Sequence, residues 1–256
     1  MNYFTSCIYG DYEKYMKIKK DLDLRQGDDL YIVGDILDGN DEDQQSNIEI
    51  MEDIMESDNV HLVLGDHEYA RVMWYASLGN EEHAQAYIDF ANAFDISGVS
   101  FNEYIKTSFC RDDYDIYFGS FLANCELTEV VPIGKRYLYL VHGSPVPYSR
   151  SCEQHWQMRV TTAFPDFNRD TFASIRTDEM ALPFLRDPQN PMTKANTITV
   201  VGQMSATEAA IMCRQSEQDD GIFYKNKTLV IGRHFTNEPI TVIGVDAAGF
   251  FLCGRY

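Results

Sequence analysis

Short apolar runs alternate with helical patterns along the first seventy residues. The runs at residues 3–8, 29–33 and 61–64 have the length and the β-branched or aromatic content of strands, and amphipathic stretches lie between them at about 11–20 and 46–56. Strands that alternate with helices are typical of βαβ units on a largely parallel sheet. The pattern therefore predicts an α/β fold for this part of the chain.

The rest of the chain is predicted to supply helices first and further strands afterwards. The stretch at about 69–112 has a helical pattern rich in aromatic residues, which we interpret as a helical insertion whose aromatics pack in a core. Three runs near the C-terminus, separated by short turns, are predicted to form an antiparallel meander in a second sheet. The strand-like runs of this part are 126–131, 135–143, 197–202, 228–232, 240–246 and 250–255. We expect residues 1–256 to form one domain, with two packed mixed β-sheets flanked by helices.

Charge and composition narrow the range of partners. The chain has 256 residues, 45% of them hydrophobic, which is enough for one buried core. With 21 Lys and Arg against 40 Asp and Glu, the net charge is −19, and such a field repels phosphate backbones and anionic lipid head groups. We therefore expect no nucleic-acid partner and no membrane partner. The scattered cysteines, the absence of a signal-peptide pattern and the absence of a long apolar run predict a cytoplasmic protein.

Polar residues follow the predicted strands at five places. The strings are CIYG (7–10), GDILDGN (34–40), GDHE (65–68), HG (142–143) and GQM (202–204). Because ligands of open α/β sheets bind outside the carboxyl ends of the strands, we expect these five strings to converge on one site.

The order and spacing of the strings resemble the calcineurin-like metallophosphoesterases, specifically their serine/threonine protein phosphatase branch. That family carries D-x-H-G, G-D-x-x-D-R-G, G-N-H-E, H-A/G-G and G-H-T in the same order. Here Cys7 and Asp35 are 28 residues apart and Asp35 and Asp66 are 31 apart, about one βα unit each. The resemblance covers residues 7–204. It implies a metallophosphoesterase-like sandwich, a divalent metal centre and phosphoric monoester hydrolase activity.

The resemblance also implies roles for individual residues. Asp35 matches the carboxylate that bridges two metal ions, and Asp66, His142 and Gln203 match the remaining ligands of the second ion. His67 and Asp38 match the catalytic pair, in which the imidazole protonates the leaving oxygen and the carboxylate orients the imidazole.

Five ligand or phosphate-binding positions of the family pattern are replaced, and three of these replacements weaken the predicted chemistry most. Cys7 and Tyr9 replace the Asp and His ligands of the first ion, and Gly39 replaces the phosphate-binding Arg; the other two departures are Asp66 for Asn and Gln203 for His. A phenol with a pKa of about 10 is a poor ligand at neutral pH, and a lone thiolate favours softer ions than a carboxylate does. We therefore expect at most one divalent ion (Mn, Zn, Fe or Mg), or none.

The leading hypothesis is a degenerate member of the family, a pseudophosphatase with little or no phosphatase activity that acts by binding. Its partner would be a phosphorylated protein or a small phosphorylated ligand. An active metal-dependent phosphomonoesterase with a one-metal site on Asp35, Asp66 and His142 is the alternative. A third hypothesis is a structural role in which Tyr9 plugs the cleft. Independently of these hypotheses, we interpret Cys7 as a small buried hydrophobe and Glu68 as a residue that holds its loop by accepting backbone N–H bonds.

Overall fold

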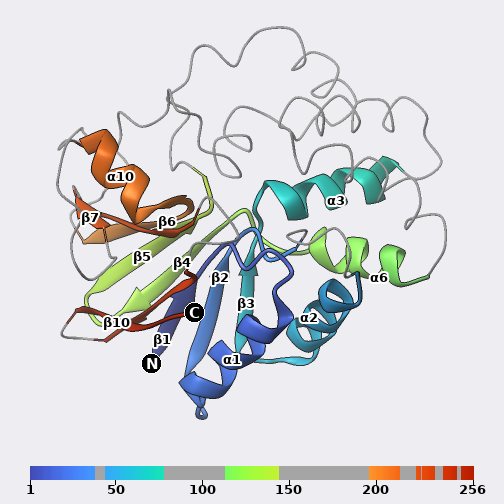
Figure 1. The fold of residues 1–256 in the computed structure, drawn as a ribbon, viewed down its shortest axis with the longest axis horizontal. Helices are drawn as coiled ribbons and strands as arrows, with labels where there is room; N and C mark the ends of the chain where they lie inside the picture. Colours follow the sequence, from blue (N-terminus) through green and yellow to red (C-terminus); the bar gives the residue numbers. More distant parts are fainter. Residues whose placement is uncertain are drawn as a thin grey trace, which may run out of the picture.

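Two five-stranded sheets pack face to face in this computed structural model (Figure 1). Their contact is an apolar layer to which Phe4, Tyr31 and Val33 contribute from one sheet and Leu140 and Val200 from the other. The described residues are 1–37, 44–77, 113–143, 196–213, 223–225, 227–233, 239–246 and 249–256. The predicted α/β fold of two packed mixed sheets flanked by helices is confirmed.

The first sheet has the order β10-β9-β1-β2-β3. Its strands are β1 (Asn2–Thr5), β2 (Asp29–Val33), β3 (Val60–Val63), β9 (Thr241–Val245) and β10 (Phe250–Arg255). β1, β2 and β3 are parallel, so their carboxyl ends lie at one edge, whereas β9 is antiparallel to β1 and β10 is antiparallel to β9.

The second sheet has the order β4-β5-β6-β8-β7. Its strands are β4 (Thr128–Ile133), β5 (Arg136–Val141), β6 (Thr197–Ser205), β7 (Phe223–Lys225) and β8 (Thr228–Gly232). The three central strands β5, β6 and β8 are parallel, and the outer strands β4 and β7 pair antiparallel with their neighbours. The first sheet therefore has parallel strands on one side and antiparallel strands on the other, whereas the second has a parallel centre with one antiparallel strand at each edge.

Strand alternation explains how the first sheet buries both of its faces. Along β2, Leu30 and Ile32 point to a core shared with the helices, while Tyr31 and Val33 point to the second sheet. The helices that contribute to this core are α1 (Tyr12–Leu22), α2 (Gln44–Glu56) and α6 (Asp113–Leu122), and α3 (Asp66–Ser77) packs on α6. On the second sheet, α10 (Ala206–Cys213) packs against β6, β7 and β8. The first sheet thus lies between helices and the second sheet.

The predicted C-terminal meander is wrong in its first strand and in the sheet to which it belongs, whereas the antiparallel pairing of its last two strands, β9 and β10, is confirmed. β8 belongs to the second sheet, where it runs parallel to β6, whereas β9 and β10 belong to the first sheet. Every residue of β8 and β9 is buried, so neither strand shows the alternation that would indicate which sheet it joins. A pattern of strands separated by short turns is equally compatible with a chain that crosses from one sheet to the other.

One helix starts earlier than predicted, and two further helices were not predicted. Helix α3 begins at Asp66, three residues before the predicted start of the helical insertion, and α6 and α10 were not predicted. Residues 78–112, the rest of the predicted insertion, lie outside the described residues. In the part of the chain that the structure describes, no helix has the length and apolar character needed to span a membrane.

Candidate metal centre

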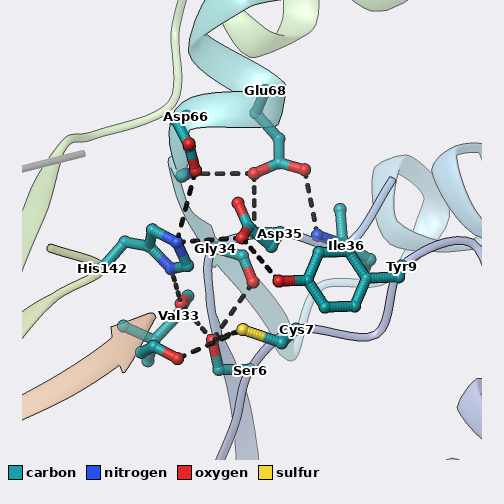
Figure 2. A network of polar contacts seen from close by, with 12 residues as sticks. Ser6, Cys7, Tyr9, Val33, Gly34, Asp35, Ile36, Asp66, Glu68 and His142 are labelled. Atoms are coloured by element: carbon teal, nitrogen blue, oxygen red, sulfur yellow. Dashed lines mark hydrogen bonds and ion pairs between the residues drawn. The ribbon is translucent and has the colours of Figure 1, made fainter. Parts of the chain in front are cut away.

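The carboxyl ends of β1, β2, β3 and β5 bring five polar side chains into one buried cluster (Figure 2). Its members are Cys7, Tyr9, Asp35, Asp66 and His142. Cys7, Asp35 and His142 each place one potential ligand atom within 4.8 Å of the others, and Asp35, Asp66 and His67 do the same. Asp35 belongs to both groups and is therefore the centre of the cluster.

His142 has its tautomer fixed by the backbone. The imidazole is fully buried, and Nδ1 lies 2.7 Å from the carbonyl oxygen of Val33. A carbonyl only accepts hydrogen bonds, so Nδ1 carries the proton and Nε2 of the neutral ring presents a lone pair. Nε2 points at Asp35 Oδ2 at 3.1 Å and at Asp66 Oδ1 at 3.6 Å. Nε2 thus faces both carboxylates, as a proton donor when the ring is charged and with a lone pair when the ring is neutral.

This convergence fits a cation. Asp35 and Asp66 are 2% and 3% exposed, and Asp35 Oδ1 has no hydrogen-bond partner among the described residues. Burial lowers the pKa of His142, but the charge and hydrogen bond of Asp35 together with the hydrogen bond of Asp66 raise it, and the pKa lies well above its usual value. A proton or a divalent ion between these atoms relieves the same repulsion, and carboxylate and imidazole are ligands that Mn²⁺, Zn²⁺ and Fe²⁺ accept.

The first turn of α3 supplies a second group of polar side chains. Asp66, His67 and Glu68 are its first three residues, and carboxylates at a helix N-terminus interact favourably with the helix dipole. His67 is half-buried and stacks edge-on against the Tyr9 ring, with the centroids 5.7 Å apart. The string predicted to form a loop is therefore a helix start, which fixes the directions of these side chains.

Glu68 holds the loops of two strands together, as interpreted from the sequence. Its carboxylate is fully buried and accepts four backbone N–H bonds, of 2.8 Å from Asp35, 2.9 Å from Ile36, 3.2 Å from Leu37 and 3.0 Å from Gly65. Burial raises the pKa of Glu68, and hydrogen bonds from N–H donors oppose that rise because they favour the carboxylate. Glu68 thus determines where Asp35 lies without facing the cluster itself.

Cys7 uses its thiol within the protein. The thiol donates a 3.2 Å hydrogen bond to the carbonyl oxygen of Gly202 and lies 3.4 Å from Ser6 Oγ. Burial, followed by the negative charge of Asp35, raises the pKa of the thiol to about 11. The sulfur is therefore protonated at neutral pH and acts as a hydrogen-bond donor.

Tyr9 also remains protonated and directs its hydroxyl at the central carboxylate. The hydroxyl donates a 3.2 Å hydrogen bond to Asp35 Oδ2. Burial raises the pKa of Tyr9 far above its usual range, and the nearby negative charges raise it further. The phenol therefore meets Asp35 as a donor and not as a second anion.

The backbone around this contact is strained. Cys7, Tyr9 and Asp35 have φ values of 54°, 53° and 53°, in the left-handed region that costs a non-glycine residue about 1–2 kcal/mol. Backbone hydrogen bonds from Cys7 to Gly34, from Tyr9 to Asp35 and from Gly10 to Ile36 join the β1 and β2 loops. Strained residues persist where the surroundings over-determine them, and such positions cluster at functional sites.

Arg233 completes the support of the β1 loop from the second sheet. It directly follows β8, is 2% exposed, and donates hydrogen bonds of 2.6 Å from Nε to the Cys7 carbonyl and 3.0 Å from Nη2 to the Ile8 carbonyl. Its guanidinium carbon lies 5.5 Å from the centroid of the Tyr9 ring, within the range of a cation–π contact. The buried guanidinium of Arg233 thus lies next to the Tyr9 ring.

Comparison with known proteins identifies the family. The sequence model of the calcineurin-like phosphoesterases matches residues 3–220. The chain belongs to the calcineurin-like phosphoesterase family.

Two solved structures are similar in fold to this calcineurin-like phosphoesterase. A metallophosphoesterase from Sphaerobacter thermophilus is 14% identical, with 100% of this chain and 89% of that chain covered and a TM-score of 0.45. A protein serine/threonine phosphatase from Saccharomyces cerevisiae is 12% identical, with 100% of this chain and 79% of that chain covered and a TM-score of 0.48. Comparison with the curated proteins finds no match.

Two glycines of this calcineurin-like phosphoesterase are required by the site itself. Gly34 has φ 79°, and a Cβ there would lie 2.2 Å from His142 Nδ1. A Cβ on Gly202 would lie 1.9 Å from the Val33 carbonyl oxygen, the acceptor of that same imidazole. His142 therefore reaches its position only because both neighbouring backbones lack side chains.

The structure places some predicted residues of the calcineurin-like phosphoesterase site and leaves others undescribed. Gln203 lies inside β6, beside a register irregularity, and its backbone N–H donates to the His142 carbonyl at 2.8 Å. Asp38 and Gly39 lie outside the described residues. Arg233 was missed because it matches no family string. Its position immediately after a strand was the available signal.

Proposed function

We propose that this chain is a degenerate calcineurin-like phosphoesterase of the serine/threonine phosphatase type, with at most one divalent ion and little or no phosphatase activity. It acts by binding a phosphorylated protein or a small phosphorylated ligand. The observation that carries the proposal is that both side chains at the replaced ligand positions keep their protons and donate hydrogen bonds. Tyr9 donates its hydroxyl proton to Asp35, and Cys7 donates its thiol proton to the Gly202 carbonyl.

Protonated donors do not bind metal ions well. A carboxylate and a neutral imidazole at these positions would each offer a lone pair, whereas the phenol and the thiol each offer a proton. The β1 loop thus supplies no ligand for a first ion at neutral pH, which supports a centre reduced to one ion.

One ion would be held by Asp35, Asp66 and His142, with Gln203 as a further oxygen ligand. When bound, such an ion supplies a Lewis acid that polarises a phosphoryl oxygen and lowers the pKa of a bound water. The carboxylates of Asp35 and Asp66 face His142 Nε2. The hydrogen bond from Nδ1 to the Val33 carbonyl fixes the ring, so that the Nε2 lone pair of the neutral ring would be directed at the ion. His67 and Asp38 would be the pair that holds and delivers the proton for the leaving oxygen.

The electrostatics of the cluster support low activity. Asp35 and Asp66 place two carboxylates where the phosphoryl group of a substrate would lie, and Gly39 supplies no guanidinium in compensation. Transition-state charge in phosphoryl transfer is stabilised by cations, and each loss of about 1.4 kcal/mol lowers the rate tenfold. Losing one ion and one arginine together therefore lowers the rate by orders of magnitude.

A second function, an active phosphomonoesterase with one ion, is supported by the position of His67. Its ligand-type atom lies within 4.8 Å of those of Asp35 and Asp66, so a general acid lies beside the proposed ion. In this alternative His67 protonates the leaving oxygen while Asp35, Asp66 and His142 hold the ion.

Ion content and turnover of an aryl phosphate separate the two functions. We expect at most one ion per chain after dialysis against Mn²⁺ or Zn²⁺, and turnover with added Mn²⁺ near background. Two ions per chain would overturn the reduced centre. Robust turnover that is lost in both Asp35→Asn and His67→Ala would favour the active one-ion enzyme.

Restoring the family residues provides a positive control. The combined variant Cys7→Asp, Tyr9→His, Gly39→Arg and Gln203→His should bind a second ion and gain turnover relative to the natural chain. A folded combined variant that binds two ions and yet gains no turnover would show that the lost activity has another cause.

A further inference from the structure

The contact between Tyr9 and Asp35 involves the carboxylate oxygen that faces His142. We propose that Tyr9 and Arg233 form a metal-excluding pair, in which the Tyr9 hydroxyl competes with a divalent ion for Asp35 Oδ2 and Arg233 positions Tyr9 for that contact. The inference rests on the proposed ion site at Asp35, Asp66 and His142.

Geometry shows why the hydroxyl and an ion compete. Asp35 Oδ2 is 3.1 Å from His142 Nε2 and 3.2 Å from the Tyr9 hydroxyl oxygen. An ion held between Asp35 and His142 therefore uses the oxygen that already accepts the phenolic proton. At 3.2 Å the hydrogen bond is a long one, and it places the phenolic hydrogen on the side of the oxygen that a metal ion would approach.

Arg233 provides the support that this contact needs. The backbone of Cys7 and Tyr9 is left-handed, a conformation that does not persist without external constraints. Arg233 supplies such constraints through two hydrogen bonds to the carbonyls of Cys7 and Ile8, and its guanidinium lies against the Tyr9 ring. It reaches the loop from β8, in the opposite sheet, so the loop is held between the two sheets.

The guanidinium also acts through its charge. An arginine is always protonated, and its hydrogen-bond fork cannot be reproduced by a lysine. Its fixed positive charge lies behind the ring that stands where the family has a ligand of the first ion, and like charges repel strongly in a buried environment. The pair therefore opposes an ion in two ways, because Tyr9 occupies the shared oxygen and Arg233 repels a cation on the side of the β1 loop.

The most direct test removes one oxygen atom. Tyr9→Phe keeps a ring against His67 and Arg233 and deletes only the donor to Asp35. We expect Tyr9→Phe to bind Mn²⁺ about tenfold more tightly than the natural chain in isothermal titration calorimetry. Tyr15→Phe is the matched control, because it deletes another buried hydroxyl that donates to a carboxylate, that of Asp53, away from the cluster. It should leave Mn²⁺ affinity unchanged.

A double-mutant cycle tests the positioning role of Arg233. Arg233→Lys should tighten Mn²⁺ binding in the natural chain, because Tyr9 is held less firmly on Asp35, and should have no effect on affinity in the Tyr9→Phe background. A residue that only supports the fold would lower the melting temperature in both backgrounds and would change Mn²⁺ affinity equally in both.

The outcomes distinguish this inference from the proposed function. Equal Mn²⁺ affinities of the natural chain, Tyr9→Phe and Arg233→Lys would overturn the metal-excluding pair and leave the ion site intact. No binding by any of the three would overturn both the pair and the ion site, and would leave the proposed lack of phosphatase activity standing. Should Tyr9→Phe fail to fold, Arg233→Lys alone decides, since a tighter ion supports the pair and an unchanged affinity rejects it.

Discussion

The two sides of the cluster use their polar atoms in opposite ways. On the side of β2, β3 and β5, the carboxylates of Asp35 and Asp66 face Nε2 of His142. On the side of β1, Cys7 and Tyr9 direct protons at acceptors of the protein. The first side needs a cation or a proton for its stability, whereas the second is satisfied by the protein alone.

This difference teaches that hydrogen bonding, as well as the identity of the side chains, determines which atoms of the cluster are available to a metal ion. The Tyr9 hydroxyl donates to Asp35 Oδ2, the same oxygen that lies 3.1 Å from His142 Nε2. The β1 loop and the β2 loop are nevertheless joined by backbone hydrogen bonds and have equal left-handed strain at Cys7, Tyr9 and Asp35. The two sides therefore share one hydrogen-bonded backbone and differ only in how their side chains use their polar atoms.

The largest effect on the electron-rich side is expected from Glu68→Ala. The change leaves four buried N–H donors without their acceptor and should reduce the free energy of unfolding by about 4 kcal/mol, measured by urea denaturation. Glu52→Ala, at an exposed position of α2, is the matched control and should change stability by less than about 0.5 kcal/mol. A loss below about 1 kcal/mol for Glu68→Ala would show that the loops are held by other contacts.

A glycine pair separates crowding at His142 from backbone strain. Gly34→Ala combines a left-handed backbone with a Cβ 2.2 Å from His142 Nδ1, and we expect a loss of about 3 kcal/mol together with loss of Mn²⁺ binding. Gly27→Ala has a similar φ of 88° with no atom within 4 Å, so it should cost only about 1 kcal/mol and leave ion binding intact. Equal losses for the two variants would mean that His142 moves aside without cost.

The pH dependence of stability should expose the demand for positive charge at His142. The pKa of His142 in the folded protein lies well above the ordinary value of 6.5, so its stabilising contribution is complete below about pH 6.5 and is lost as pH rises through the raised pKa. With a chelator present, the urea midpoint should therefore fall at alkaline pH. Mn²⁺ should stabilise the protein more at pH 8 than at pH 6, because the ion needs the lone pair of Nε2.

The control for this dependence is His142→Asn, which removes the titrating ring. Its urea midpoint in chelator should lack the alkaline fall that is specific to the natural chain. An identical fall in both proteins would assign the pH dependence to other groups and would contradict the inference that the side of Asp35, Asp66 and His142 needs a positive charge.

The smallest effect is expected from Cys7→Ser on the β1 side, where the polar atoms already have hydrogen-bond partners within the protein. A hydroxyl donates to the Gly202 carbonyl as the thiol does, so the free energy of unfolding should change by less than about 1 kcal/mol and Mn²⁺ affinity by less than about threefold. The Co²⁺ form of the natural chain should lack a thiolate charge-transfer absorption band. The presence of that band, and its loss in Cys7→Ser, would make Cys7 a ligand and erase the distinction between the two sides.

Local sequence determined much of this protein. The alternation of apolar and polar residues predicted the strands near 29–33 and 61–64 and the helices between the first strands, because side-chain periodicity follows from backbone geometry alone. The polar strings after those strands predicted which residues share an edge of the sheet. The interpretation of Glu68 as an acceptor of backbone N–H bonds was also confirmed, although Glu68 lies in the first turn of α3 and not in a loop.

Tertiary structure decided the rest, because it depends on contacts between distant segments. Whether β8 and β9 share a sheet is not encoded in two fully buried strands, and the sequence pattern gave the wrong answer. The contact of Tyr9 with Asp35 depends on left-handed backbone at both residues, and its support by Arg233 joins residues more than 220 positions apart. Sequence therefore determined which chemical groups reach the site, and only the packing of the two sheets decided which of those groups donate protons to one another.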